Sequence, residues 1–207
     1  MFLLGDVYDN LRDAAAQAVY IGVLRNLIFF KQKLAKSYGP RRTVIDEIVL
    51  HGTESKASQE QSATYLQGAI GIHYFIGRDS GLAYRIVPDE YQSFHAGNPK
   101  HHSKVQDHNP KSIGIEMYQQ DISVFKNDAS KLDFTDWQYQ TVAILCYHIC
   151  HRWNIPRTNI VGHGEVNPVD RSPDEPRNFD WDRFNRNLDD TSSSLVGLLG
   201  PDFALPR

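Results

Sequence analysis

Cysteine is scarce in this sequence, which holds two such residues, Cys146 and Cys150. They lie four positions apart in a segment with helical periodicity, where their side chains share a face but cannot easily form a disulfide. We therefore expect two buried thiols. A secreted scaffold stabilised by disulfides is disfavoured.

The chain also lacks a long run of apolar residues. Its longest apolar stretch, residues 14–30, contains Arg25 and two side-chain amides, so it is too polar for a membrane span. Residues 1–4 are apolar, but no basic residue precedes them and Asp6 interrupts them at once, unlike a signal peptide. We expect no transmembrane segment, and a cytoplasmic or phage-encoded protein rather than an exported one.

An excess of one charge sign is absent as well. The formal net charge is -3, from 22 basic and 25 acidic residues, which gives no basic surface for nucleic acid. Hydrophobic residues make up 41% of the chain and charged residues 23%, as in ordinary globular domains. A length of 207 residues suits one domain with an appendage, and we expect a monomer.

Hydrophobic periodicity and turn residues predict an α/β fold. Because strands and helices do not alternate strictly, we expect a mixed central β-sheet flanked by helices. Residues 1–40 are expected to form a helical extension, with one helix over 9–36; residues 41–190 form the main domain, and 191–207 a tail. The predicted strands are 43–50, 72–77, 82–88, 112–119 and 159–162, and the predicted helices are 58–67, one from Thr135, and 181–188.

Three short segments carry residues suited to a metal site. His51 and His163 each end a predicted strand and precede a glycine, and Asp174 follows 11 positions after His163 in Arg171-Ser172-Pro173-Asp174. A hydrolytic zinc ion takes three nitrogen or oxygen ligands and keeps a fourth position for water. A single histidine at a strand end is more often structural, however, and spacing alone does not bring these side chains together.

A longer series of motifs resembles the zinc-dependent N-acetylmuramoyl-L-alanine amidases. This family includes phage endolysin amidases, bacterial cell-wall recycling amidases and animal peptidoglycan recognition proteins. Because the blocks occur in the family's order across residues 44–181, the match is far more specific than any one motif. The blocks are Val49–Thr53, Ile72–Asp79, Phe94–Gly97, Ser112–Glu116, Phe134–Tyr139, Val161–Glu165, and Asp174 with Phe179–Trp181.

The resemblance implies a fold, a reaction and a site. It implies the sheet-and-helix fold of these amidases, and hydrolysis of the bond between N-acetylmuramic acid and L-alanine in peptidoglycan or muropeptides. It assigns zinc (Zn2+) to His51, His163 and Asp174, a catalytic carboxylate to Glu116, and a place in the substrate groove to His95. General-base and then general-acid work by Glu116 fits this chemistry.

The sequence departs from the family pattern beside the third ligand. Members often carry a lysine two positions before it, where this chain has Ser172, and Arg171 is the expected substitute in binding substrate. Two alternatives stay open: a peptidoglycan-binding module of the same fold without activity, and a general zinc peptidase. A binder does not need Glu116 with a full ligand set, and a peptidase cuts between amino acids.

Overall fold

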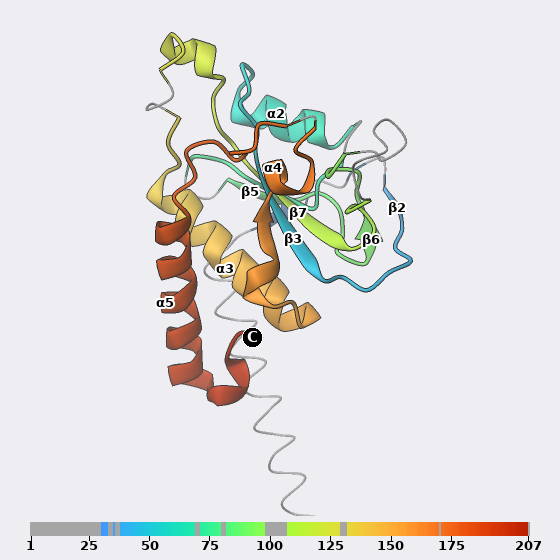
Figure 1. Ribbon diagram of the computed structural model, residues 1–207, viewed down its shortest axis with the longest axis vertical. Helices are drawn as coiled ribbons and strands as arrows, with labels where there is room; N and C mark the ends of the chain where they lie inside the picture. Colours follow the sequence, from blue (N-terminus) through green and yellow to red (C-terminus); the bar gives the residue numbers. More distant parts are fainter. Residues whose placement is uncertain are drawn as a thin grey trace, which may run out of the picture.

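A six-stranded sheet forms the centre of the computed structural model (Figure 1). The structure describes residues 30–32, 35, 38–68, 71–79, 82–97, 107–128, 132–169 and 171–206. The strand order is β1-β5-β4-β7-β3-β8, and every neighbouring pair is parallel except β4 with β5. The strands are β1 (Phe30–Gln32), β3 (Glu47–Gly52), β4 (Tyr74–Ile76), β5 (Ala83–Arg85), β7 (Ser112–Met117) and β8 (Ile160–Gly162). The predicted mixed sheet is confirmed.

Helices pack on the sheet, and one of them follows directly after a strand. The α-helices are α2 (Gln59–Leu66), α3 (Asp136–Trp153), α4 (His163–Val166) and α5 (Trp181–Leu199). Short 3-10 helices are η1 (Ile122–Phe125), η3 (Arg157–Asn159) and η4 (Pro201–Phe203), and β2 (Gly39–Pro40) pairs antiparallel with β6 (Tyr91–Gln92). Among the helices of the described residues, none has the length and apolar character to cross a membrane.

The alternation of side chains along β3 and β7 separates the two faces of the sheet. Ile48 and Leu50 of β3 are fully buried, with Ile113 and Ile115 of β7, in the main core together with residues of α3 and α5. Because successive strand residues point to opposite faces, the residues between them face away from α3. The second face is therefore free to carry polar side chains at the strand ends.

Local signals placed the helix starts well. Ser58 caps α2 and Thr135 caps α3, and each forms a capping box with the glutamine three residues later. The predicted helix from Thr135 ends at Trp153, and its C-cap residue, Asn154, has a left-handed backbone with φ 55°. This position suits Asn, which adopts that conformation more readily than most residues.

The predicted amino-terminal helix is corrected where the structure describes it. Residues 30–32 form strand β1, which pairs in parallel with β5, and the Ala35 N–H donates to Ile86 O at 2.9 Å. The remainder of the predicted 9–36 helix lies outside the described residues. The backbone groups of β5 offer hydrogen bonds to residues 30–32, and the periodicity of one segment cannot reveal such a distant partner.

The end of the chain also differs from the prediction. The helix expected at 181–188 continues to Leu199, so the first part of the predicted tail is helical. Leu188 and Leu195, on one face of α5, are buried in the main core with residues of α3. The serines between them have the composition of a linker, but packing of the apolar face decides the outcome.

Candidate metal centre

Three parallel strand ends bring the predicted histidines together. His51 lies near the end of β3, and the register of β3 and β7 pairs it with Glu116. On the other side of β3, Leu50 pairs with Gly162 at the end of β8, and His163 follows directly as the first residue of α4. His51 is 3% exposed and His163 1% exposed. The strand order therefore explains why histidines 112 positions apart meet.

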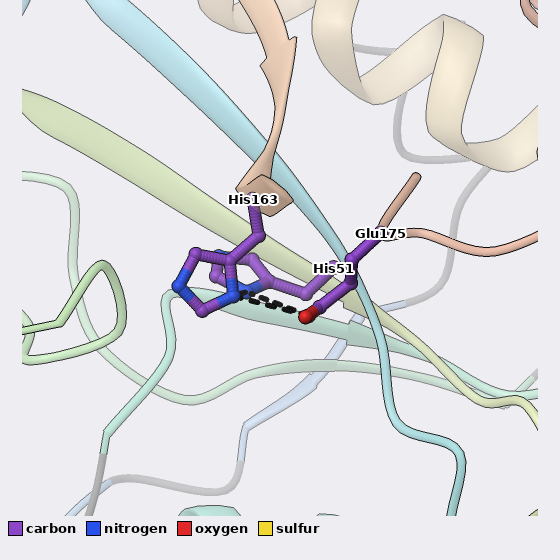
Figure 2. A group of neighbouring side chains, drawn as sticks. All are labelled: His51, His163 and Glu175. Carbon is purple, nitrogen blue, oxygen red and sulfur yellow. Dashed lines mark hydrogen bonds and ion pairs between the residues drawn. The ribbon is translucent and has the colours of Figure 1, made fainter. Parts of the chain in front are cut away.

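A carboxylate completes a cluster with the two imidazoles (Figure 2). The Nδ1 atoms of His51 and His163 are 2.9 Å apart. Oε1 of Glu175 lies 3.0 Å from Nδ1 of His163 and 3.9 Å from Nδ1 of His51. Two imidazole nitrogens and one carboxylate oxygen thus converge on one point from three separate segments.

The donor set and its spacing fit a zinc ion. A tetrahedral zinc with ligands at about 2.0–2.2 Å requires ligand atoms roughly 3.3 Å apart. The three separations here, 2.9, 3.0 and 3.9 Å, bracket that value. Burial, followed by the nearby imidazoles of His163 and His95, lowers the pKa of His51 well below its ordinary value. A neutral imidazole is the form that binds metal.

Two glycines around His163 make room for the segment that carries Glu175. A Cβ on Gly162 would lie 2.6 Å from the carbonyl oxygen of Glu175, and one on Gly164 would lie 2.7 Å from the backbone of Pro173. The Gly164 N–H also donates to the Glu175 carbonyl at 3.1 Å. The Gly-His-Gly sequence therefore allows the 172–176 loop to lie against β8 and α4.

The structure brings Glu175, and not the predicted ligand Asp174, into contact with the two imidazoles. The Asp174 side chain is 63% exposed, hydrogen-bonds with the Ser172 hydroxyl and lies 3.9 Å from Nε of Arg177. The Glu175 side chain is 10% exposed and points into the cluster. The two carboxylates are neighbours in sequence, and the Glu175 backbone carbonyl accepts a hydrogen bond from the Gly164 N–H. The order of the family motifs predicted Asp174 as a ligand, and the sequence analysis did not consider Glu175.

Glu116 and Arg171 lie beside this cluster. Burial first, and then the charge of Glu175, raise the pKa of Glu116 to about 8, while the charge of Arg171 acts in the opposite direction. Nε of Arg171 lies 3.8 Å from Oε2 of Glu175, and its side chain is 49% exposed. The structure thus places a buried carboxyl group with a raised pKa and a half-exposed cation beside the two imidazoles.

His95 lies next to His51 in the structure. It is 6% exposed, and its Nδ1 lies 2.9 Å from Nε2 of His51, on the side away from Glu175. Its Nε2 lies 3.1 Å from Oγ of Ser112, a residue that the sequence did not single out. The structure therefore places His95 in the protein interior, in contact with a histidine of the cluster.

Comparison with known proteins identifies related sequences. A family model described as N-acetylmuramoyl-L-alanine amidase matches residues 40–178. The 1,6-anhydro-N-acetylmuramyl-L-alanine amidase AmpD of Citrobacter freundii is 31% identical over 115 residues, covering 56% of this chain and 55% of AmpD. The Escherichia coli K12 AmpD is also 31% identical over 115 residues. The chain thus spans about half the length of these curated relatives.

Solved structures share the fold. A selenomethionine derivative of AmpD superposes with a TM-score of 0.58 at 21% identity, over 77% of this chain and 94% of that one. AmiD from E. coli, in complex with anhydro-N-acetylmuramic acid-L-Ala-D-gamma-Glu-L-Lys, gives 0.53 at 23% identity, over 74% and 60%. The family model spans more than half of the 207 residues, and the chain therefore belongs to the N-acetylmuramoyl-L-alanine amidase family.

Proposed function

We propose that this protein is a zinc-dependent amidase that hydrolyses the bond between N-acetylmuramic acid and L-alanine in muropeptides. The observation that carries the proposal is the cluster of His51, His163 and Glu175 beside Glu116. Such a site combines a metal-binding donor set with a carboxyl group able to move protons. Membership of the amidase family supports the choice of reaction.

The cluster supplies the residues that would hold the ion. His51 and His163 offer Nδ1 lone pairs, and Glu175 offers Oε1, so all three ligand atoms come from buried side chains. Zinc bound there would supply Lewis acidity that activates water near neutral pH and polarises the scissile carbonyl. We propose Glu175 as the third ligand in place of Asp174, because the exposed Asp174 side chain lies outside the cluster.

The remaining chemistry belongs to Glu116 and Arg171. Glu116 accepts a proton from the attacking water while the new carbon–oxygen bond forms. It then donates this proton to the departing amine of L-alanine as the carbon–nitrogen bond breaks. The Arg171 guanidinium, whose Nε is 3.8 Å from Glu175, is close enough to the cluster to stabilise negative charge on the carbonyl oxygen.

For the substrate, we propose a soluble anhydro-muropeptide. The AmpD relatives are named for 1,6-anhydro-N-acetylmuramyl-L-alanine, and AmiD was solved with an anhydro-muropeptide. A direct test compares soluble anhydro-muropeptide with intact cell wall, each incubated with the purified zinc-loaded protein. Mass spectrometry should detect the free peptide with a new amino terminus on L-alanine, mainly from the soluble substrate. Faster release from intact wall would contradict this substrate preference.

The same assay separates the other functions. Binding of the muropeptide without release of peptide would indicate a binding module, and cleavage between amino acids would indicate a peptidase. The Glu116→Gln variant should retain zinc and bind substrate but lose turnover. Glu90→Gln, the same change at an exposed carboxylate paired with Arg152, is the matched control and should retain wild-type turnover. Normal turnover by Glu116→Gln would remove Glu116 from the mechanism.

A further inference from the structure

A line of buried side chains runs from the metal centre into the protein. We propose that Ser112 and His95 form a positioning relay that fixes the tautomer of His51 and directs its Nδ1 lone pair toward the metal. This inference rests on the proposed metal site. It assigns His95 to the support of a ligand rather than to contact with substrate.

The direction of the relay follows from the single hydrogen of a serine hydroxyl. The Ser112 hydroxyl donates to the backbone oxygen of His108 at 2.6 Å. Its hydrogen is then used, so the same oxygen can only accept from Nε2 of His95, which lies 3.1 Å away. Nε2 of His95 therefore carries a hydrogen.

The next step fixes His51. His95 is buried, and its ring centroid lies 5.0 Å from that of His51 and 5.6 Å from that of His73. The one hydrogen of the neutral His95 imidazole is on Nε2, as its contact with the Ser112 oxygen requires, so its Nδ1 carries a lone pair. That lone pair accepts from Nε2 of His51 at 2.9 Å. A neutral imidazole has one ring hydrogen, which leaves Nδ1 of His51 without one.

The relay matters because the groups that face Nδ1 of His51 favour the tautomer with the hydrogen on Nδ1, which cannot bind a metal through that nitrogen. Nδ1 of His51 faces Nδ1 of His163 at 2.9 Å and the Glu175 carboxylate at 3.9 Å. Without the metal, His163 Nδ1 and the Glu175 carboxylate can each accept a hydrogen bond from Nδ1 of His51. A hydrogen on that nitrogen would take the place of the lone pair that the metal needs. The hydrogen bond to His95 opposes this, because it requires the hydrogen on Nε2. Partners of this kind orient metal-binding histidines in other proteins.

The backbone of β7 is shaped to hold this relay. Ser112, Gly114 and Glu116 alternate along the same face of the strand, which is the face that carries His51. A Cβ on Gly114 would lie 2.6 Å from both Cγ and Nδ1 of His95, so the imidazole ring occupies the space of the missing side chain. Strand β7 thus provides Ser112, which ends the relay, the space at Gly114 that the His95 ring fills, and Glu116, the proposed general base.

The tautomers can be measured without metal or substrate. Long-range proton–nitrogen NMR spectra of zinc-free protein labelled with 15N-histidine should show hydrogen on Nε2 of both His51 and His95 at neutral pH. Hydrogen on Nδ1 of either ring would overturn the relay. Because this experiment requires neither zinc nor turnover, its outcome is independent of the test of the proposed amidase activity.

Variants then connect the relay to metal affinity. His95→Leu should weaken zinc binding by about ten- to a hundredfold, measured by chelator competition, as for other partners of metal ligands. Ser112→Ala should also weaken zinc binding, and the NMR spectra of this variant should show hydrogen on Nδ1 of His95 or His51. His95→Asn keeps an acceptor near the position of Nδ1 and should restore most of the affinity.

Ser93→Ala is the matched control for Ser112→Ala. Ser93 is equally buried, and its Oγ lies 3.0 Å from Nδ1 of His73, an imidazole outside the metal cluster. We expect this variant to keep wild-type zinc affinity and the wild-type tautomer of His51. Equal losses of affinity in the two serine variants, or wild-type affinity in His95→Leu, would overturn the proposal. So would a His95→Asn variant that binds zinc as weakly as His95→Leu.

Discussion

Substitution of Gly164 by alanine tests how the structure holds Glu175 in place. A Cβ at this position would lie 2.7 Å from both the carbonyl carbon and oxygen of Pro173, and closer still to the carbonyl oxygen of Ser172. These are backbone atoms, so the 172–176 loop must move instead of a flexible side chain. Gly→Ala in a helix normally stabilises by roughly 0.5–1 kcal/mol. Here we expect a loss of about 1–3 kcal/mol from overpacking.

The same movement should reach the metal centre. The Gly164 N–H donates to the Glu175 carbonyl at 3.1 Å, so a displaced loop carries the Glu175 carboxylate away from His163. We expect zinc affinity to fall about ten- to a hundredfold, as when a supporting interaction of a ligand is removed. Urea unfolding of the zinc-free protein gives the change in stability, and chelator competition gives the change in affinity.

Gly197→Ala provides the matched control. Gly197 lies within α5, and a Cβ there would have no heavy atom within 4 Å. This variant should gain up to about 1 kcal/mol of stability and keep its zinc affinity. If Gly164→Ala were stabilised to the same degree with unchanged affinity, the close packing of the loop against α4 would be refuted.

Three further changes test separate parts of the account. Arg171→Ala should lower kcat about a hundred- to a thousandfold with zinc content unchanged, measured with anhydro-muropeptide; an unchanged kcat would exclude Arg171 from charge stabilisation. Thr135→Ala removes the α3 cap and should lower the free energy of unfolding by about 1 kcal/mol; an unchanged urea midpoint would contradict this contribution. Chelation should abolish turnover and lower Tm, and added zinc should restore both, because zinc binds the native state; activity that survives full removal of zinc would contradict the mechanism.

Local sequence signals predicted the parts of the fold that local interactions determine. The alternation of apolar residues along 112–119 predicted β7, and the pairing of Thr135 with Gln138 predicted the start of α3. The same strand pattern placed Glu116 opposite its apolar neighbours, and the structure pairs it in register with His51. The meeting of His51 with His163 followed from family resemblance, because their spacing contains no information on strand order.

The features that sequence failed to predict depend on contacts between distant segments. Glu175 lies in the cluster where its backbone carbonyl accepts a hydrogen bond from Gly164, a contact between segments that the motif order does not contain. The place of His95 behind His51 depends on the empty position at Gly114, which becomes apparent only once the strands are paired. Strand β1 and the second half of α5 likewise form on partners that periodicity cannot identify.

The most direct measurement is a crystal structure of the zinc-loaded protein with anomalous scattering recorded at the zinc edge, together with zinc content for Glu175→Ala and Asp174→Ala. We predict one ion about 2.0–2.2 Å from His51, His163 and Glu175, lost in Glu175→Ala and retained in Asp174→Ala. An ion bound to Asp174 with Glu175 turned away, or the reverse pattern of zinc content, would contradict the proposed ligand set. Absence of zinc at both histidines would contradict the metal centre itself.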